Sequence, residues 1–172
     1  MRQILAVVTL YAFVLGAMPG PAWASSPHFI SASASVASSG VLTATFKEAG
    51  LGTTVATESI TLSVATATSE YFCINGGGKH PSATNKQTAS SSLQASGNFP
   101  VRNGQTTGSL SVGPVGPQGF SCPNGQTLTL ISVSYTGVQL TGLAGDTANI
   151  SGTFSACLDT RFPGADPTGV CP

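Results

Sequence analysis

Apolar and polar residues alternate with a period of two along much of the chain, while helical periodicity is nearly absent after the first 24 residues. This pattern is typical of β-strands that have one face in a core and one face in water. The alternation covers 41–47, 59–66, 109–112, 126–141 and 150–158, and we expect a further, opening strand over 29–37. It predicts an all-β fold, an antiparallel β-sandwich of immunoglobulin-like architecture with about seven or eight strands.

The longest alternating stretch, 126–141, changes phase twice. Its apolar residues switch parity between Leu130 and Ile131, and they switch again around Gly137. A slip of one residue moves every following side chain to the opposite face of a strand. We therefore expect two β-bulges here, or a strand that changes sheets.

Turn residues separate the predicted strands. Asn103-Gly104 lies between apolar residues on both sides and is the strongest hairpin signal in the chain. Pro123-Asn124-Gly125 suits a turn into the long strand, whereas 113–117 is expected to be a loop.

The first 24 residues have the features of a secretory signal peptide. Arg2 is followed by an apolar stretch from Ile4 to Ala17 and by Ala22-Trp23-Ala24, a small-residue cleavage pattern. The apolar stretch is shorter than the roughly 20 residues that span a bilayer. We expect a secreted protein with no membrane attachment after cleavage, a β-sandwich domain over 25–158 and an irregular tail over 159–172.

Charged residues make up 7% of the chain, with 6 Lys and Arg against 6 Asp and Glu, while Ser and Thr make up a quarter. No basic cluster exists that could bind nucleic acid by releasing counterions. Hydroxyl side chains favour β-strands and can cover their wet faces. Cleavage would remove Trp23, the only tryptophan, which weakens any proposal of sugar binding on an aromatic platform.

All four cysteines follow the signal peptide, which indicates disulfides in a secreted protein. Four cysteines allow three pairings. We favour Cys73–Cys122, which would join a strand end to a turn, and Cys157–Cys171, which would pin the tail. Zinc is disfavoured because no Cys-x-x-Cys pair is present, and we expect no cofactor. Tyr71-Phe72-Cys73 copies the Tyr-x-Cys of a late immunoglobulin strand, but no cysteine precedes it to form the partner signal.

The segment from Cys73 to Lys86 holds three consecutive glycines together with Lys79, His80 and Lys86, and it contains no acidic residue. Glycines that adopt positive φ can build an anion-binding nest of backbone amides. The candidate ligand-binding residues are Asn75, Gly76, Gly77, Gly78, Lys79, His80, Asn85 and Lys86. The competing and favoured interpretation is a wide connection between strands that starts at a disulfide.

Catalytic chemistry has few candidate groups. The sequence contains neither a Gly-x-Ser-x-Gly nucleophile motif nor a His-Glu-x-x-His zinc motif. We expect Glu58 and Glu70 on the wet side or at the ends of strands. Asn149-Ile150-Ser151 matches a glycosylation acceptor, which matters only in a eukaryotic secretory pathway. No catalytic or metal-binding residue is predicted.

Two motifs together, Cys-x-Asn-Gly-Gly-Gly over Cys73–Gly78 and Cys-Pro-x-Gly-Gln-x-Leu over Cys122–Leu128, carry a resemblance. The chain resembles a group of small, uncharacterised, secreted bacterial proteins. The resemblance implies a signal peptide, a β-rich fold and a Cys73–Cys122 bond, and it supplies no catalytic residues.

The leading hypothesis is a secreted, non-enzymatic structural or surface-interaction protein of the cell exterior, with an extracellular protein or the cell wall as partner. The alternative is a soluble, inhibitor-like binding module that uses the 74–86 loop. A small secreted hydrolase is the third hypothesis. The sequence makes no prediction about oligomeric state.

Overall fold

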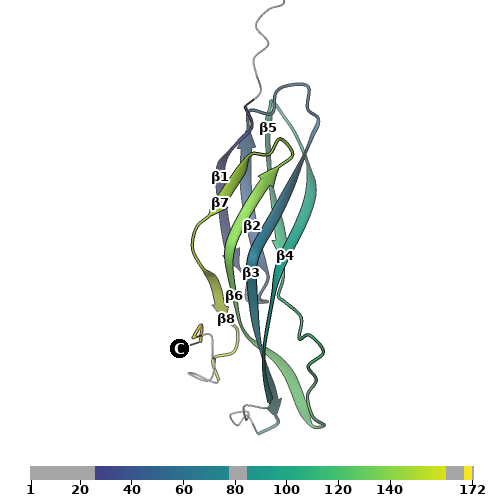
Figure 1. Cartoon of the computed structure of the whole chain (residues 1–172), viewed down its shortest axis with the longest axis vertical. Helices are drawn as coiled ribbons and strands as arrows, with labels where there is room; N and C mark the ends of the chain where they lie inside the picture. The colour runs from purple at the N-terminus through teal and green to yellow at the C-terminus, as the bar shows by residue number, and fades with distance from the viewer. Residues whose placement is uncertain (1–25, 78–84, 162–168, 172) are drawn as a thin grey trace, which may run out of the picture.

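The computed structural model describes residues 26–77, 85–161 and 169–171, so the predicted signal peptide and much of the predicted tail lie outside the described residues. The described chain forms an all-β sandwich of two antiparallel sheets, which confirms the predicted fold class (Figure 1). Its strands are β1 (His28–Val36), β2 (Leu42–Ala49), β3 (Thr57–Asn75), β4 (Lys86–Pro100), β5 (Gln105–Val112), β6 (Gln126–Gly142), β7 (Thr147–Ile150) and β8 (Phe154–Cys157).

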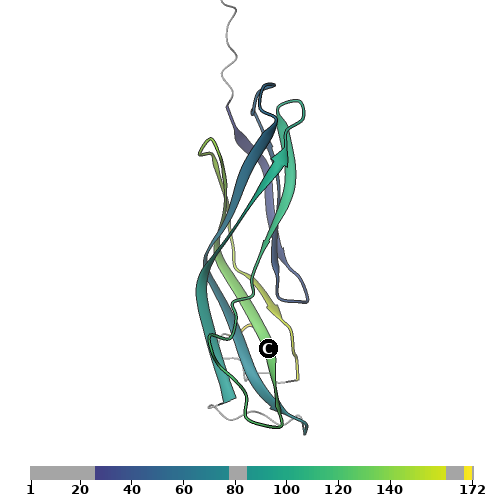
Figure 2. The ribbon, with the colours of Figure 1, turned by 90° about the vertical axis from the view of Figure 1, so that its right-hand side faces the viewer.

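One sheet has three strands in the order β1-β2-β5, and the other has five. In the larger sheet the order is β4-β3-β6, after which β7 and β8 pair with successive parts of β6. Figure 2 shows that the sandwich is long and narrow, with the strands running along its length. No described segment forms a helix of the length and hydrophobicity that a membrane crossing requires.

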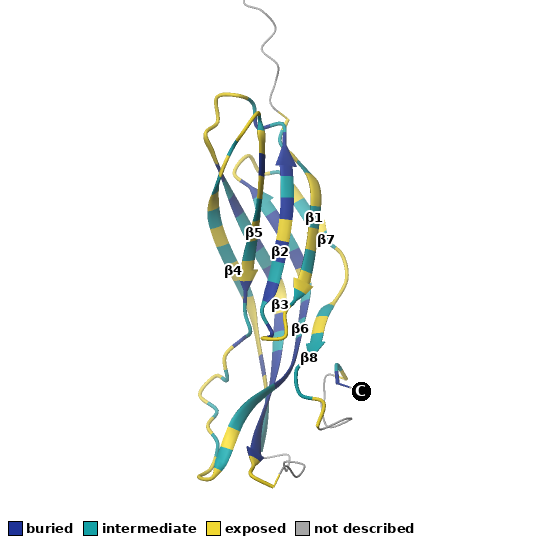
Figure 3. Cartoon of the chain, turned by 180° about the vertical axis from the view of Figure 1, so that it is seen from behind, coloured by how far each residue is buried: buried dark blue, intermediate teal, exposed yellow. Residues whose placement is uncertain are grey.

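The core lies between the two sheets and follows the predicted alternation. Every second residue is buried over 42–48 of β2, 58–64 of β3 and 138–142 of β6, and Figure 3 shows the banding along these strands. Phe46 is the aromatic centre at one end of this core, because its ring meets those of Phe29 and Phe99 edge-on at 6.1 and 4.9 Å. Gly108 leaves room for this contact, since a β-carbon there would lie 2.4 Å from the Phe99 ring.

Bulges, not a change of sheet, explain both phase changes in 126–141. The first is a register shift at Ile131, where Glu70 pairs with Ser132 but Tyr71 pairs with Leu130. At the second, Gly137 adopts φ +65°. Between Val64 and Ala67, β3 has one residue more than its neighbour β4, whereas β3 and β6 stay in register. The two strands change face together there, so β6 stays in one sheet.

A second, smaller core forms on the outer side of the five-stranded sheet. Phe72, Ile74 and the bulged Ile131 pack there with Cys171. The carbonyl oxygen of Ile131 accepts hydrogen bonds from the backbone N–H groups of Leu158 and Asp159 at 2.7 and 3.2 Å. The bulge therefore binds the start of the C-terminal tail.

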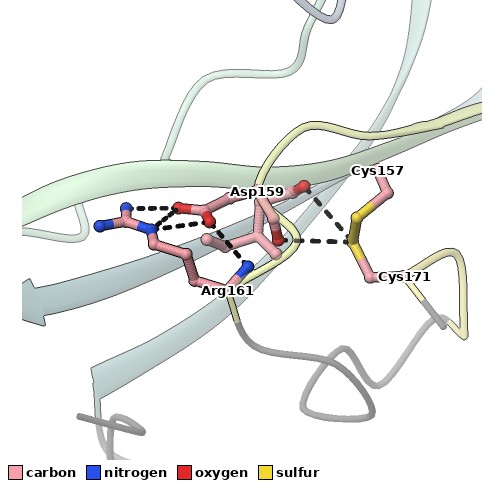
Figure 4. Close-up of a disulfide and its surroundings, with 5 residues drawn as sticks. Cys157, Asp159, Arg161 and Cys171 are labelled. Atoms are coloured by element: carbon pink, nitrogen blue, oxygen red, sulfur yellow. Dashed lines mark hydrogen bonds and ion pairs between the residues drawn. A yellow bond between two sulfur atoms is a disulfide. The ribbon is translucent and has the colours of Figure 1, made fainter. Parts of the chain in front are cut away.

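Two disulfides join the pairs that the sequence favoured. Cys73 on β3 bonds to Cys122 in the loop before β6, and Cys157 at the end of β8 bonds to Cys171. Figure 4 shows the second bond. The Cys171 sulfur lies 3.6 Å from the Ile131 carbonyl oxygen. Both bonds are compatible with an oxidising environment.

The turn predicted at Asn103-Gly104 forms and connects β4 to β5, but these strands belong to different sheets and do not pair as the predicted hairpin. Both residues have positive φ, at 51° and 71°, and a bridge between Arg102 and Gln105 closes the turn. Left-handed φ values at both central residues are typical of a tight two-residue turn.

Candidate functional site

The predicted ligand loop begins at one end of the sandwich, where β3 finishes. Asn75, Gly76 and Gly77 are exposed there, whereas Gly78, Lys79 and His80 lie outside the described residues. Gly76 and Gly77 do not have positive φ, and a β-carbon on Gly76 would meet nothing within 4 Å. The structure therefore gives no support to an anion nest at these two glycines.

Asn85 and Lys86 lie at the start of β4. Lys86 is paired in register with Phe72, and its ammonium nitrogen lies 4.8 Å from the centre of the Phe72 ring. A cation in this position is attracted to the face of the ring. The Lys86 side chain thus covers the small outer core and does not join Asn75 and Gly76 in a common pocket.

A small pocket of about 330 Å³ does include part of the predicted loop. Asn75 and Gly76 line it together with Thr127 and Thr129 from β6 and with Arg161, which the sequence analysis did not single out. The Arg161 guanidinium donates to the Asp159 carboxylate, with Nε 2.9 Å from Oδ1 and Nη2 2.5 Å from Oδ2 (Figure 4). These hydrogen bonds lower the pKa of Asp159 and raise that of Arg161, so the charge in this pocket is already paired.

Glu58 and Glu70 were expected on the wet side or at the ends of strands; both side chains are buried, and only Glu58 lies at the end of a strand. Glu58 is 3% exposed and Glu70 is 1% exposed. Glu58 has the same parity as Ile60 and Leu62 and therefore points inward, where its Oε1 accepts a hydrogen bond from the backbone N–H of Leu143 at 2.6 Å. Glu70 points to the outer core, on the same side of β3 as Phe72, and pairs in register with Ser132.

A cluster of three carboxyl groups lies near the β6–β7 turn, formed by Glu48, Glu58 and Asp146. Glu48 is fully buried, and neither its oxygens nor those of Asp146 have an N–H or O–H partner among the described residues other than each other. Burial, followed by the negative charges of Asp146 and Glu58 and a hydrogen bond with Asp146, raises the pKa of Glu48 to about 8.

With its pKa raised to about 8, Glu48 keeps a proton in this carboxyl cluster at neutral pH. The described residues contain no group of three His, Cys, Asp or Glu side chains placed to hold a metal ion. A substrate could not touch Glu48 either, because its side chain is fully buried.

A larger groove of about 850 Å³ crosses the outer face of the five-stranded sheet at the second bulge. Its polar side chains include Ser63, Gln94, Gln139 and Asn149, and its floor includes Ala65 and Gly137. Gln139 Nε2 donates to Asn149 Oδ1 at 2.7 Å. Two sequence signals lie at this groove: the phase change at Gly137, which predicted a bulge, and the glycosylation acceptor pattern Asn149-Ile150-Ser151. Neither predicted a binding site.

No protein-family model matches this chain, no curated protein is significantly similar to it in sequence, and no solved structure is significantly similar to it in fold.

Proposed function

We propose that the protein is a secreted, non-enzymatic structural or surface-interaction protein of the cell exterior, with a cell-wall polymer or an extracellular protein as its partner. The observation that carries the proposal is the outer face of the three-stranded sheet. That face presents rows of hydroxyl side chains, which we call the hydroxyl face. Its residues are Ser31, Ser33, Ser35, Thr43, Thr45, Lys47, Thr107, Ser109 and Ser111.

The register of the strands places these side chains in three rows across the sheet. The central row is Ser33, Thr45 and Ser109. Ser33 and Thr45 share a hydrogen bond of 2.9 Å, and Thr43 and Ser111 share one of 2.8 Å. Lateral bonds between hydroxyl groups hold the side chains in place, and Lys47 is the only charge on the face. A neutral, ordered surface of this kind suits contact with another hydroxyl-rich surface.

The burial of the acidic residues supports the non-enzymatic part of the proposal. General acid–base catalysis needs a titratable group that can reach the substrate. Glu48, Glu58 and Glu70 are all buried, which leaves few groups on the described surface that could take this role.

Fractionation of the producing culture, with the mature protein followed by intact mass, tests the proposal. We expect cleavage after Ala24, loss of four hydrogens on forming two disulfides, and retention in the cell-wall fraction. The variant Ser33→Lys/Thr45→Lys/Ser109→Lys puts three charges on the hydroxyl face and should release the protein into the medium.

The matched control is Ser96→Lys/Thr61→Lys/Thr141→Lys, which adds the same charge to a corresponding row on the other sheet. This control should remain with the wall. The proposal is wrong if both triple variants stay bound, or if the protein turns over a substrate and loses that activity when one carboxylate is changed.

The pocket of about 330 Å³ beside Asn75, Gly76 and Arg161 favours a second candidate, the soluble binding module that uses the 74–86 loop. Arg161→Ala and Lys79→Ala/His80→Ala should then abolish capture of a soluble partner without changing the melting temperature. Capture that survives both changes would exclude this candidate.

A further inference from the structure

The groove on the five-stranded sheet contains a single row of polar side chains that crosses four strands. Ser63 on β3 pairs in register with Gln94 on β4 and with Gln139 on β6, and Gln139 pairs with Asn149 on β7. We call these four residues the amide row. Neighbouring strands are about 4.8 Å apart, so the row extends over roughly 14 Å, enough for a short oligosaccharide.

The floor beside the row is smooth because the two strands bulge together. Gly137 has φ +65°, and a β-carbon on it would lie 2.6 Å from the Ala65 β-carbon. Glycine is therefore needed for this close approach. The result is a patch of backbone and one methyl group on which the apolar face of a sugar ring can lie.

The amide pair at one end of the row is ordered for hydrogen bonding. The bond from Gln139 Nε2 to Asn149 Oδ1 holds both side chains in a fixed orientation. It leaves Gln139 Oε1 as an acceptor and Asn149 Nδ2 as a donor. A vicinal diol can donate to the first and accept from the second, because each hydroxyl does both.

We propose that the amide row binds a neutral oligosaccharide that lies across the strands. The inference goes beyond the proposed function, because it concerns the opposite sheet and stands even if the hydroxyl face has no partner.

The chemistry of the lining selects this class of ligand over others. None of the residues that line the groove is charged, so an ionic ligand would lose water without gaining a counter-charge. An apolar ligand would cover amides without satisfying them. A peptide that adds a strand needs a sheet edge, whereas this groove lies on the face of the sheet.

An NMR titration of the mature protein tests the proposal. The ¹⁵N-labelled protein is exported in a bacterial host, so that its disulfides form and Asn149 stays unmodified. The probes are the neutral hexasaccharides of cellulose, starch, mannan and xylan, with a hexamer of galacturonic acid as the charged comparison. We expect at least one neutral probe to shift the amide signals of 63–65, 92–94, 137–139 and 149–152.

The binding is expected to be in the millimolar range, because no aromatic ring lines the groove. The variant Gln139→Ala/Asn149→Ala should weaken it at least tenfold with little change in melting temperature. The matched control is Thr68→Ala/Ser90→Ala, which removes one side-chain hydrogen bond outside the groove lining and should leave binding unchanged.

Four results would overturn the proposal. They are the absence of shifts with every neutral probe, shifts that map outside the groove, equal binding by the galacturonic acid hexamer, and unchanged affinity in the Gln139→Ala/Asn149→Ala variant.

Discussion

Glu48 and Asp146 place two carboxyl groups beside the same glycine inside the sandwich. A β-carbon on Gly142 would lie 2.5 Å from Asp146 Oδ1 and 3.1 Å from Glu48 Oε1. Two carboxylates this close repel each other, and a proton held between them removes the repulsion. The pKa of Glu48, raised to about 8 from an ordinary 4.5, means that the folded protein keeps this proton at neutral pH.

The first prediction is that the protein loses stability as the pH rises. The folded state binds the Glu48 proton more tightly than the unfolded chain does, so its stabilising effect is complete below pH 4.5 and is lost as the pH passes 8. We expect the melting temperature to fall by on the order of 10 °C between pH 5 and pH 9. Thermal unfolding across this range measures it.

Glu48→Gln should remove most of this pH dependence, because glutamine can donate to Asp146 without titrating. Asp159→Asn is the control, because hydrogen bonds from Arg161 lower the pKa of that carboxyl and it does not titrate between pH 5 and pH 9. An equal pH dependence in Glu48→Gln and in the wild type would show that Glu48 does not hold the proton.

The second prediction concerns the loop after β5. Val115 is held by two side chains of β3, because Tyr71 donates to its carbonyl oxygen at 2.7 Å and its N–H donates to Ser69 Oγ at 3.0 Å. Burial raises the pKa of Tyr71, which keeps its hydroxyl protonated and able to donate. Tyr71→Phe and Ser69→Ala should each lower the free energy of unfolding by about 1–2 kcal/mol.

Urea denaturation measures these losses. Ser91→Ala is the matched control, because Ser91 is exposed and bonds only to the neighbouring Ser92 carbonyl. Its cost should stay below about 0.5 kcal/mol. A cost for Ser69→Ala no greater than that of the control would refute the role of Ser69.

Strands with a regular row of large apolar side chains could be predicted from the sequence. The sequence pattern did not predict β4. The inner face of β4 carries the large side chains Leu93 and Phe99, but the small residues Ala95 and Gly97 separate them and weaken the alternation. The strand forms because β3 offers a long edge, a tertiary cause that a local pattern does not carry.

The burial of Glu48 and Glu58 could have been predicted from their position in the alternating pattern. Glu48 continues the parity of Leu42, Ala44 and Phe46, and Glu58 that of Ile60 and Leu62. Glu58 was expected on the wet side or at the end of a strand, whereas parity places both Glu48 and Glu58 inward. The amide row could not have been predicted, because its four residues come from four strands whose register depends on the bulges.

The third prediction compares the two disulfides. In the chain-entropy model a crosslink stabilises more when it closes a longer loop, by about 3 kcal/mol for 15 residues. The sequence separations are 49 for Cys73–Cys122 and 14 for Cys157–Cys171. We expect losses of about 4 kcal/mol for Cys73→Ser/Cys122→Ser and about 3 kcal/mol for Cys157→Ser/Cys171→Ser.

Urea denaturation of both double variants measures the difference, and limited proteolysis locates it. Loss of Cys157–Cys171 should also release the tail from Ile131 and expose the outer core, so cleavage near the C-terminus should become faster. Unchanged proteolysis in Cys157→Ser/Cys171→Ser would contradict the assignment of this bond to tail docking.

The fourth prediction separates two costs of replacing Gly137. Gly137→Ala forces an alanine into φ +65° and also brings its β-carbon to 2.6 Å from that of Ala65. Gly125 has φ +79° but open space around it, so Gly125→Ala measures the backbone cost alone, about 1 kcal/mol. We expect Gly137→Ala to cost at least about 1 kcal/mol more than that.

The double variant Ala65→Gly/Gly137→Ala tests the origin of the extra cost. Ala65→Gly removes the colliding methyl group, so it should recover the difference between Gly137→Ala and Gly125→Ala but not the backbone cost. The coupling energy from a double-mutant cycle in urea is the measurement. A coupling near zero would mean that the two strands can separate at the bulge, and that the groove floor does not depend on the close approach of these two residues.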